Sequence, residues 1–287
     1  MSSENSFLNK LITHHKVVHD LGFVIIGFVT ASLLYFEVKS IGVNSESALL
    51  IAQNQTKLVE LSVQKRAEEL STSVIDRLAK AVELLSSDNP SIRLAGMYSL
   101  ERLAGDLPSE SVSIARIVTT FLTNPPNGTK QDEVQRGFTA LLRIVKKIGA
   151  EPFLSQEKSL NLKGLKLENM HIKDYSFKGF SMIGTHFHNV GFSGVDFTDV
   201  NLKGATFNNC YKDGILNFTS ADLSHSVIMT SDFSEAIFVN TKLTGSIIKD
   251  GIFDNSDFSG ANMDGLTYSN TQFYGSIEPP KTHKNKQ

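Results

Sequence analysis

The chain has 287 residues, 40% of them hydrophobic and 20% charged, so it is long enough for two domains and at least part of it should fold. A formal net charge of −2 argues against a strongly basic nucleic-acid-binding protein. A single cysteine, Cys210, excludes an internal disulfide framework and a cysteine-rich zinc site, and 19 phenylalanines beside no tryptophan require an explanation.

The first candidate element is an uncharged run at residues 21–36, bounded by Asp20 and Glu37. As a helix it would reach about 24 Å, short of the roughly 30 Å hydrocarbon core, so a buried helix of a soluble protein stays open as the alternative to a membrane anchor. A cleaved signal peptide fits less well, because the leader carries acids and no small-residue cleavage site follows. We interpret the run as a single uncleaved transmembrane anchor formed by Leu21, Phe23, Ile25, Ile26, Phe28, Leu33, Leu34 and Phe36.

The flanking charges do not fix the orientation of this anchor. Two lysines precede the run and one follows it closely, which weakly favours a cytoplasmic N-terminus and a periplasmic body. The leader histidines His14, His15 and His19 resemble a metal cluster, but polar residues beside a membrane anchor are the commoner explanation.

Residues 45–86 contain neither proline nor glycine, and apolar residues recur along them at helical spacing with charged residues between. The pattern predicts one long helix next to the anchor. It also leaves a short coiled coil open, although Gln64 interrupts the apolar stripe.

Three shorter amphipathic helices are predicted after the long one. The first begins with Asn89 as its cap and Pro90 in its first turn, and it stops before Pro108. The second covers 110–122 and the third about 132–148. Short helices joined by short turns suggest HEAT-like helix pairs.

A period of five dominates residues 158–277. Every fifth position from Leu162 to Phe207, and again from Phe218 to Phe273, is apolar or aromatic. We expect these positions to point into the core of a narrow coil, which explains the many phenylalanines. The predicted core phenylalanines are Phe187, Phe192, Phe197, Phe207, Phe218, Phe233, Phe238, Phe253, Phe258 and Phe273.

Two departures from a uniform repeat are visible. The position two residues before each centre is small in the later repeats but large from Leu160 to Phe180, which indicates a wider end where helices dock. Cys210 occupies such a position, so we interpret it as a core residue and not as a nucleophile. The step from Phe207 to Phe218 is one residue longer than two repeats, and we expect a turn or bulge near Asp213 and Gly214.

The segments ADLSH, SDFSE, VDFTD, VNLKG and SDFSG resemble the pentapeptide-repeat family, over residues 158–277. The resemblance implies a right-handed, four-sided parallel β-solenoid with four repeats in each coil. About 23 repeats would make close to six coils, roughly 28 Å long at the usual strand spacing. The helical stretch before the repeats also resembles many bacterial membrane-associated members.

The expected organisation is therefore an α+β protein in four parts. These are a tail and transmembrane anchor (1–40), a helical stalk and cap module (41–150), the β-solenoid (151–277) and a disordered tail (278–287). The helical module should cap the N-terminal end of the solenoid, because a solenoid needs its end covered.

No sequence motif for catalysis or phosphate binding is present. His186 and His188 flank the inward Phe187 and lack a third metal ligand. We therefore expect a protein that is not an enzyme and that uses no cofactor and no metal.

The favoured function is a membrane-anchored, non-catalytic protein-interaction scaffold in the bacterial inner membrane, with a protein partner of unknown identity. We expect no direct contact with nucleic acid, and a homo-oligomer stays open. The resemblance also implies an alternative, a DNA mimic that binds and protects gyrase, and a third is a membrane-linked stress or phage-defence effector. The lysine count favours a periplasmic solenoid and the resemblance a cytoplasmic one.

Overall fold

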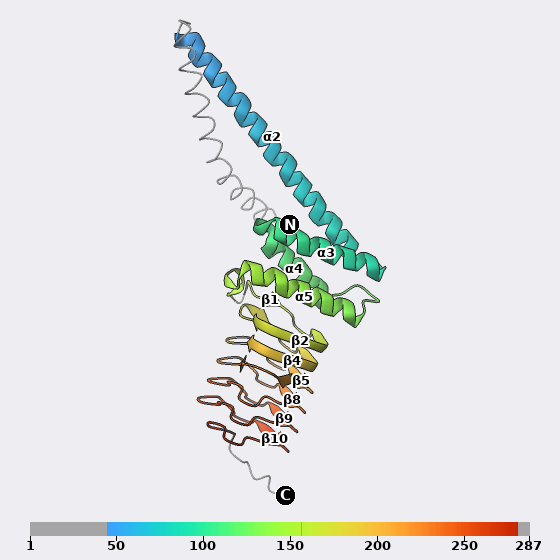
Figure 1. Ribbon diagram of the computed structural model, residues 1–287, viewed down its shortest axis with the longest axis vertical. Coiled ribbons are helices and arrows are strands. Elements are labelled where there is room, and N and C mark those ends of the chain that lie inside the picture. Colours follow the sequence, from blue (N-terminus) through green and yellow to red (C-terminus); the bar gives the residue numbers. More distant parts are fainter. Residues whose placement is uncertain (1–44, 156, 281–287) are drawn as a thin grey trace. The chain divides into compact units, whose positions relative to one another are not determined.

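The structure is a computed structural model that describes residues 45–280 except residue 156 (Figure 1). The chain divides into two compact units, Met1–Lys80 and Ala81–Gln287. In the described part of the chain, no helix is both long and apolar enough to cross a bilayer, and the predicted anchor at 21–36 falls outside that part.

The described residues of the first unit lie in α2 (Ser45–Leu85), which confirms the long helix predicted from the absence of proline and glycine. Leu58, Leu61 and Ile75 on this helix are more than half exposed. The last turn of α2 already belongs to the second unit, where Ala81 and Leu85 are buried.

The second unit begins with a helical module made of α3 (Pro90–Asp106), η1 (Pro108–Glu110), α4 (Ser111–Thr123), α5 (Gln131–Ile148) and η2 (Glu151–Phe153). These helices confirm the predicted ones to within a few residues. The Asn89 side chain accepts a hydrogen bond from the Ser91 N–H at 2.9 Å and so caps α3 as expected. The start of α5 differs slightly from the predicted start at about residue 132. Glu133 accepts a hydrogen bond from the Lys130 N–H at 3.0 Å, and the Asp132 side chain is exposed.

A buried ion pair joins the start of α3 to the start of α5. Arg93 is 1% exposed, and its Nε and Nη2 donate to the two carboxylate oxygens of Glu133 at 2.8 and 2.9 Å. The same guanidinium donates to the carbonyls of Ser87 and Asp88, in the turn before α3. The hydrogen bonds with Arg93 lower the pKa of Glu133, although burial acts in the opposite direction.

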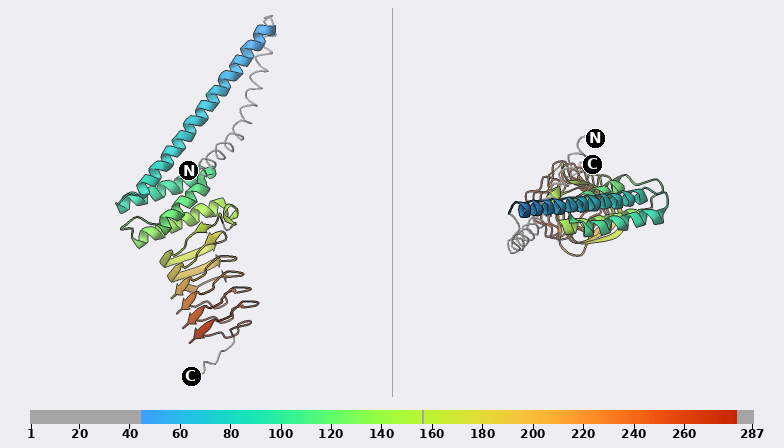
Figure 2. Two further views of the ribbon diagram at one scale, coloured as in Figure 1. Left: turned by 180° about the vertical axis from the view of Figure 1, so that it is seen from behind. Right: turned by 90° about the horizontal axis from the view of Figure 1, so that it is seen from above.

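The repeats form a parallel β-solenoid of about six coils that stack below α5 (Figures 1 and 2). Most partner residues on adjacent coils are twenty apart, as in the pairs Leu160 with Phe180 and Val227 with Ile247. The strands are β1 (Leu160–Asn161), β2 (Lys166–Ser176), β3 (Phe180–Ser181), β4 (His186–Asp196), β5 (Thr206–Asn208), β6 (Tyr211–Lys212), β7 (Leu216–Asn217), β8 (Val227–Met229), β9 (Ile247–Lys249) and β10 (Thr267–Ser269).

The chain turns a corner after every repeat, two residues beyond each inward centre. These corner residues have φ between +49° and +87° where the repeat is regular, a region that glycine, asparagine and aspartate enter at least cost. Gly245, Asn240 and Asp250 are examples from one stretch of chain. The fifth residue of the repeat is therefore selected for its backbone conformation, whereas the centre is selected for burial.

The predicted phenylalanine core is confirmed. All ten predicted phenylalanines except Phe273 are 0% exposed, and Phe273 is half-buried in the last coil. One column of rings stacks face to face down the solenoid, with centroids 4.8–5.1 Å apart from Phe177 through Phe197, Phe218, Phe238 and Phe258. Phe138 of α5 lies above Phe177 at 6.2 Å, so the column of rings extends into the helical module.

The helical module covers the N-terminal end of the solenoid, as expected. Gln131 of α5 donates its side-chain N–H to the Lys166 carbonyl at 2.6 Å, and Gln135 donates to the Glu168 carbonyl. These carbonyls lie on β2, whose outer edge no other strand pairs within the described residues. The two glutamines thus satisfy backbone acceptors that would otherwise be left at an open sheet edge.

Candidate functional site

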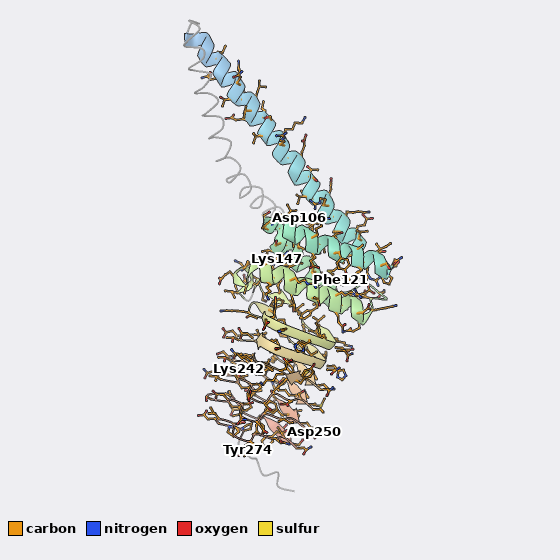
Figure 3. The ribbon with its side chains drawn as sticks, viewed as in Figure 1. Asp106, Phe121, Lys147, Lys242, Asp250 and Tyr274 are labelled. Atoms are coloured by element: carbon orange, nitrogen blue, oxygen red, sulfur yellow. The ribbon has the colours of Figure 1, made fainter. Side chains whose placement is uncertain are left out.

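The solenoid presents four outward faces, each backed by one inward column. Face 1 is backed by the column that starts at Leu162, face 2 by the column from Leu167, face 3 by the column from Ile172 and face 4 by the column from Phe177. Side chains next to the centres project outward from these columns. Figure 3 labels Lys242 and Tyr274 among them, together with the corner residue Asp250. Any site on this half of the chain is therefore made of residues from successive coils at a spacing of about twenty.

The regular stacking is broken once, on face 3 of the third coil. Phe192 pairs with Lys212 at a separation of twenty residues, but Val195 pairs with Leu216 at twenty-one. Three residues, 213–215, therefore lie opposite the two residues 193 and 194, which is a β-bulge. This confirms the predicted insertion and places it.

The bulge lacks the left-handed corner found in the regular repeats. No residue from 210 to 219 has a positive φ. Gly214 is needed here for close approach, because a Cβ on it would lie 3.0 Å from Ser193 Oγ and 3.2 Å from the Gly194 nitrogen. The Asp213 N–H donates to the Phe192 carbonyl at 3.0 Å, and the Ile215 carbonyl accepts from Val195 at 2.9 Å.

Lys212 occupies an inward position that is apolar in nearly every other repeat. Its side chain is only 10% exposed, and Nζ donates to the Gly214 carbonyl at 3.1 Å. The same ammonium lies 3.5 Å from Glu235 Oε2 on the next coil. The lysine therefore contacts the bulge from its inner side. Its inward position could be predicted from the sequence, because it lies five residues after the centre Phe207.

Three residues from successive coils meet beside the bulge. A Cβ on Gly191 would lie 2.5 Å from His171 Nδ1 and 2.7 Å from Tyr211 Cζ, so these two side chains cover the glycine. His171 Nε2 also lies 3.7 Å from Asp213 Oδ1. The absence of a side chain at 191 lets groups two coils apart approach each other.

The outward side of this region combines an apolar residue with acids. Ile215 is 67% exposed and Tyr211 45% exposed. The Asp213 and Glu235 side chains are 56% and 71% exposed, and Asp232 pairs with Tyr211 from the coil below. We refer to Tyr211, Asp213, Ile215, Asp232 and Glu235 together as the bulge surface.

The other residues noted in the sequence do not assemble into a site. His186 and His188 are exposed on either side of Phe187. Among the described residues, no three His, Cys, Asp or Glu side chains gather as metal ligands would. Cys210 is 2% exposed, and burial raises the pKa of its thiol to about 11, as suits a core residue. The leader histidines lie outside the described residues.

Comparison with known proteins agrees with the repeat geometry. The family described as pentapeptide repeats matches residues 176–210 and 217–250, in eight copies. The gap between the two matched stretches contains the bulge, where the five-residue spacing fails. A search of the curated proteins found no match for the chain.

Among solved structures, QnrB1, a plasmid-mediated fluoroquinolone resistance protein, is 21% identical over 39% of this chain and 59% of its own, with a TM-score of 0.35. A pentapeptide repeat protein from the thylakoid lumen of Arabidopsis thaliana is 22% identical over 39% of this chain and 66% of its own, with a TM-score of 0.16. Rfr23 from the cyanobacterium Cyanothece 51142 is 12% identical over 41% of this chain and 90% of its own, with a TM-score of 0.20. The chain thus spans about three fifths of QnrB1 in that match. Residues 176–210 and 217–250 of the chain are therefore repeats of the pentapeptide-repeat family.

Proposed function

We propose that the protein is a non-catalytic interaction scaffold, tethered to the bacterial inner membrane by residues 21–36, whose solenoid binds a protein partner. The observation that carries the proposal is the division of each repeat between a buried centre and outward neighbours. Phe238, for example, is 0% exposed, whereas the neighbouring outward positions are free to vary without loss of the core. Such a rod offers broad faces with side chains at fixed spacing, which suits recognition of another protein.

In this proposal the helical module, with its helices arranged as HEAT-like pairs, has two roles. It separates the solenoid from the membrane anchor, and it covers the first coil through Gln131 and Gln135. The rod would therefore be held with its N-terminal end covered and its faces accessible.

A DNA mimic that binds gyrase is the alternative, and it requires a continuous acidic stripe, because its target recognises regularly spaced phosphates. Acids of the solenoid lie on different faces: Asp222 and Asp264 on face 1, Asp213, Asp232, Glu235 and Asp254 on face 3, and Asp257 on face 4. Face 1 also carries lysines, among them Lys203 and Lys242. Partial burial acts to raise the pKa of Asp222, but hydrogen bonds from Ser224 and the charges of Lys242 and Lys203 lower it. This distribution favours the scaffold.

The tether is tested by fractionation. The full chain should sediment with membranes and resist alkaline extraction, whereas a chain that begins near Ser40 should stay in solution. A full chain found in the soluble fraction would contradict the tether. A reporter fused after Gln287 then gives the side of the membrane on which the solenoid lies.

The choice between scaffold and mimic is tested with purified solenoid and gyrase. We expect no change in DNA supercoiling at micromolar protein. Inhibition that disappears when Asp232 and Asp254 are replaced by asparagine would favour the mimic.

A further inference from the structure

We propose that the bulge surface is where the solenoid binds its protein partner, and that the partner offers an apolar pocket bordered by lysine or arginine side chains. The inference rests on the proposed function, since it names a site and a partner chemistry for the scaffold.

The first support is the exposure of Ile215. At 67% it is more exposed than Ile247 at 48% or Ile277 at 54%, which also lie on the solenoid surface. Burying a side chain of this size against a partner favours binding, because it removes apolar surface from water. A protruding aliphatic residue with polar neighbours has the composition of an interface centre and its rim.

The second support is that the bulge is already ordered. The Ile215 carbonyl accepts from Val195, the Asp213 N–H donates to Phe192, and Lys212 Nζ donates to the Gly214 carbonyl. Binding of a partner at Ile215 would therefore cost little backbone entropy, because these hydrogen bonds already fix the backbone of the bulge. Preorganisation of this kind increases affinity without any added contact.

The third support is that the solenoid does not need the bulge. The adjacent coils close with twenty residues, and among the coils that the structure describes the extra residue is confined to the third. That coil also gives up an apolar inward residue, because Lys212 stands where Phe192 and Phe233 stand on its neighbours. A local departure from the packing rules that is held by specific bonds is typical of a functional site.

The charge around Ile215 defines the partner. Asp213, Asp232 and Glu235 contribute three carboxylates, and the largely buried Lys212 is the one lysine among the described residues that pairs with any of them, namely with Glu235. A complementary surface would therefore carry cations around its apolar pocket. His171 Nε2 lies 3.7 Å from Asp213 Oδ1.

The experiment places a photoreactive amino acid in the full chain, in living cells, at one outward position of each face. The positions are Ile215 for face 3 and Thr244, Ile247 and Val239 for faces 1, 2 and 4. We expect an adduct from position 215 with one partner, whose crosslinked peptide, sequenced by mass spectrometry, places Lys or Arg beside apolar residues. The adduct should weaken when Glu235→Gln and Asp232→Asn are combined in the same chain.

Adducts from the other faces and none from position 215 would agree with the proposed scaffold function but would overturn the bulge surface as its binding site. A chain that gives no adduct from any face would contradict the scaffold itself. An adduct with a second copy of this chain, or one unaffected by the two neutral substitutions, would also overturn the partner chemistry proposed here.

A binding measurement with the partner so identified provides the matched control. Ile215→Ser should raise its dissociation constant by about tenfold or more, which corresponds to about 1.4 kcal/mol, and Ile247→Ser by less than about twofold. Equal effects of the two substitutions would contradict the site. Because both isoleucines are exposed, neither change should unfold the solenoid.

Discussion

The rings of Phe192 and Phe233 lie 6.4 Å apart between centroids, although one belongs to the second coil and the other to the fourth. The residue of the third coil that lies between them in the column is Lys212, whose ammonium points to the Gly214 carbonyl. The centroid of the Phe207 ring lies 6.2 Å from that of Phe192 and 5.7 Å from that of Phe233. These three rings occupy the space that an apolar side chain at position 212 would otherwise fill.

Lys212→Ala should therefore cost less stability than loss of an inward ring. We expect its effect to be under about 2 kcal/mol, while Phe233→Ala should cost about 3–5 kcal/mol because it removes a buried ring and leaves a cavity. Urea denaturation of the three proteins measures the difference. A larger loss from Lys212→Ala than from Phe233→Ala would show that the lysine supports the core directly.

Two neighbouring isoleucines of β9 test the five-residue register with the same side chain. Ile248 is 1% exposed and Ile247 is 48% exposed. Ile248→Ala should lower the free energy of unfolding by about 2–5 kcal/mol, and Ile247→Ala by less than about 1 kcal/mol. Thermal and urea unfolding are suitable measurements. Equal losses would mean that the assignment of inward and outward positions is wrong.

The Arg93–Glu133 pair should dominate the stability of the helical module. Arg93→Ala leaves a buried carboxylate without its partner and should cost about 3–5 kcal/mol. Replacing both residues, as Arg93→Met with Glu133→Leu, should cost less, because no unpaired charge stays buried. A double replacement as costly as the single one would argue against this account.

The same pair predicts a pH dependence. The pKa of Glu133 is lowered in the folded protein, so its contribution is present above the ordinary carboxyl pKa, near pH 4, and is lost as the pH falls through the lowered value. Unfolding free energies measured between pH 7 and pH 3 should fall less steeply in Glu133→Gln than in the unchanged chain. Parallel curves would contradict the assignment.

Two glycines of α3 should respond in opposite directions to alanine. A Cβ on Gly96 would lie 2.7 Å from the Leu85 nitrogen, whereas one on Gly105 meets only Lys147 Nζ at 3.4 Å. Gly96→Ala should therefore destabilise the module by about 1–3 kcal/mol, and Gly105→Ala should stabilise it by about 0.5–1 kcal/mol. Circular dichroism melts can measure both. A stabilised Gly96→Ala variant would mean that α2 and α3 are not in close contact there.

Thr230 carries a backbone strain that asparagine would relieve. Its φ is +49°, in a region that β-branched residues enter at a cost, and Asn209 precedes it in the same column of corners. Thr230→Asn should raise stability by about 1 kcal/mol, while Thr267→Asn, at an outward position of β10 that is not a corner, should not. A loss of stability in Thr230→Asn would show that the threonine makes a compensating contact.

The repeat half was largely predictable because one local rule governs it. A centre must be apolar to be buried, and a corner must tolerate a positive φ, so residues such as Phe238 and Asn240 reveal the coil at short range. The position of the insertion could likewise be inferred from Phe207 and Phe218. The side-chain contacts around the insertion could not be predicted, because they join residues of different coils and the five-residue pattern does not encode them.

The helical module shows the same limit. Its helices could be predicted from caps and prolines, but the Arg93–Glu133 pair joins residues forty positions apart on different helices. Charges spaced four residues apart can pair within one helix, as Arg102 does with Asp106. Arg143 with Glu101, in contrast, links α5 to α3, because the packing of the helices decides which charges meet.

The hydrogen bonds from Gln131 and Gln135 to the first coil have a consequence for how this protein can change over evolutionary time. These bonds join the helices to the first coil alone, and the strands of each later coil pair with strands of the adjacent coils. A duplication or loss of twenty residues in the middle of the solenoid would therefore leave the helical module and the first coil unchanged. Rod length can vary in whole coils while the chemistry of its covered end stays constant.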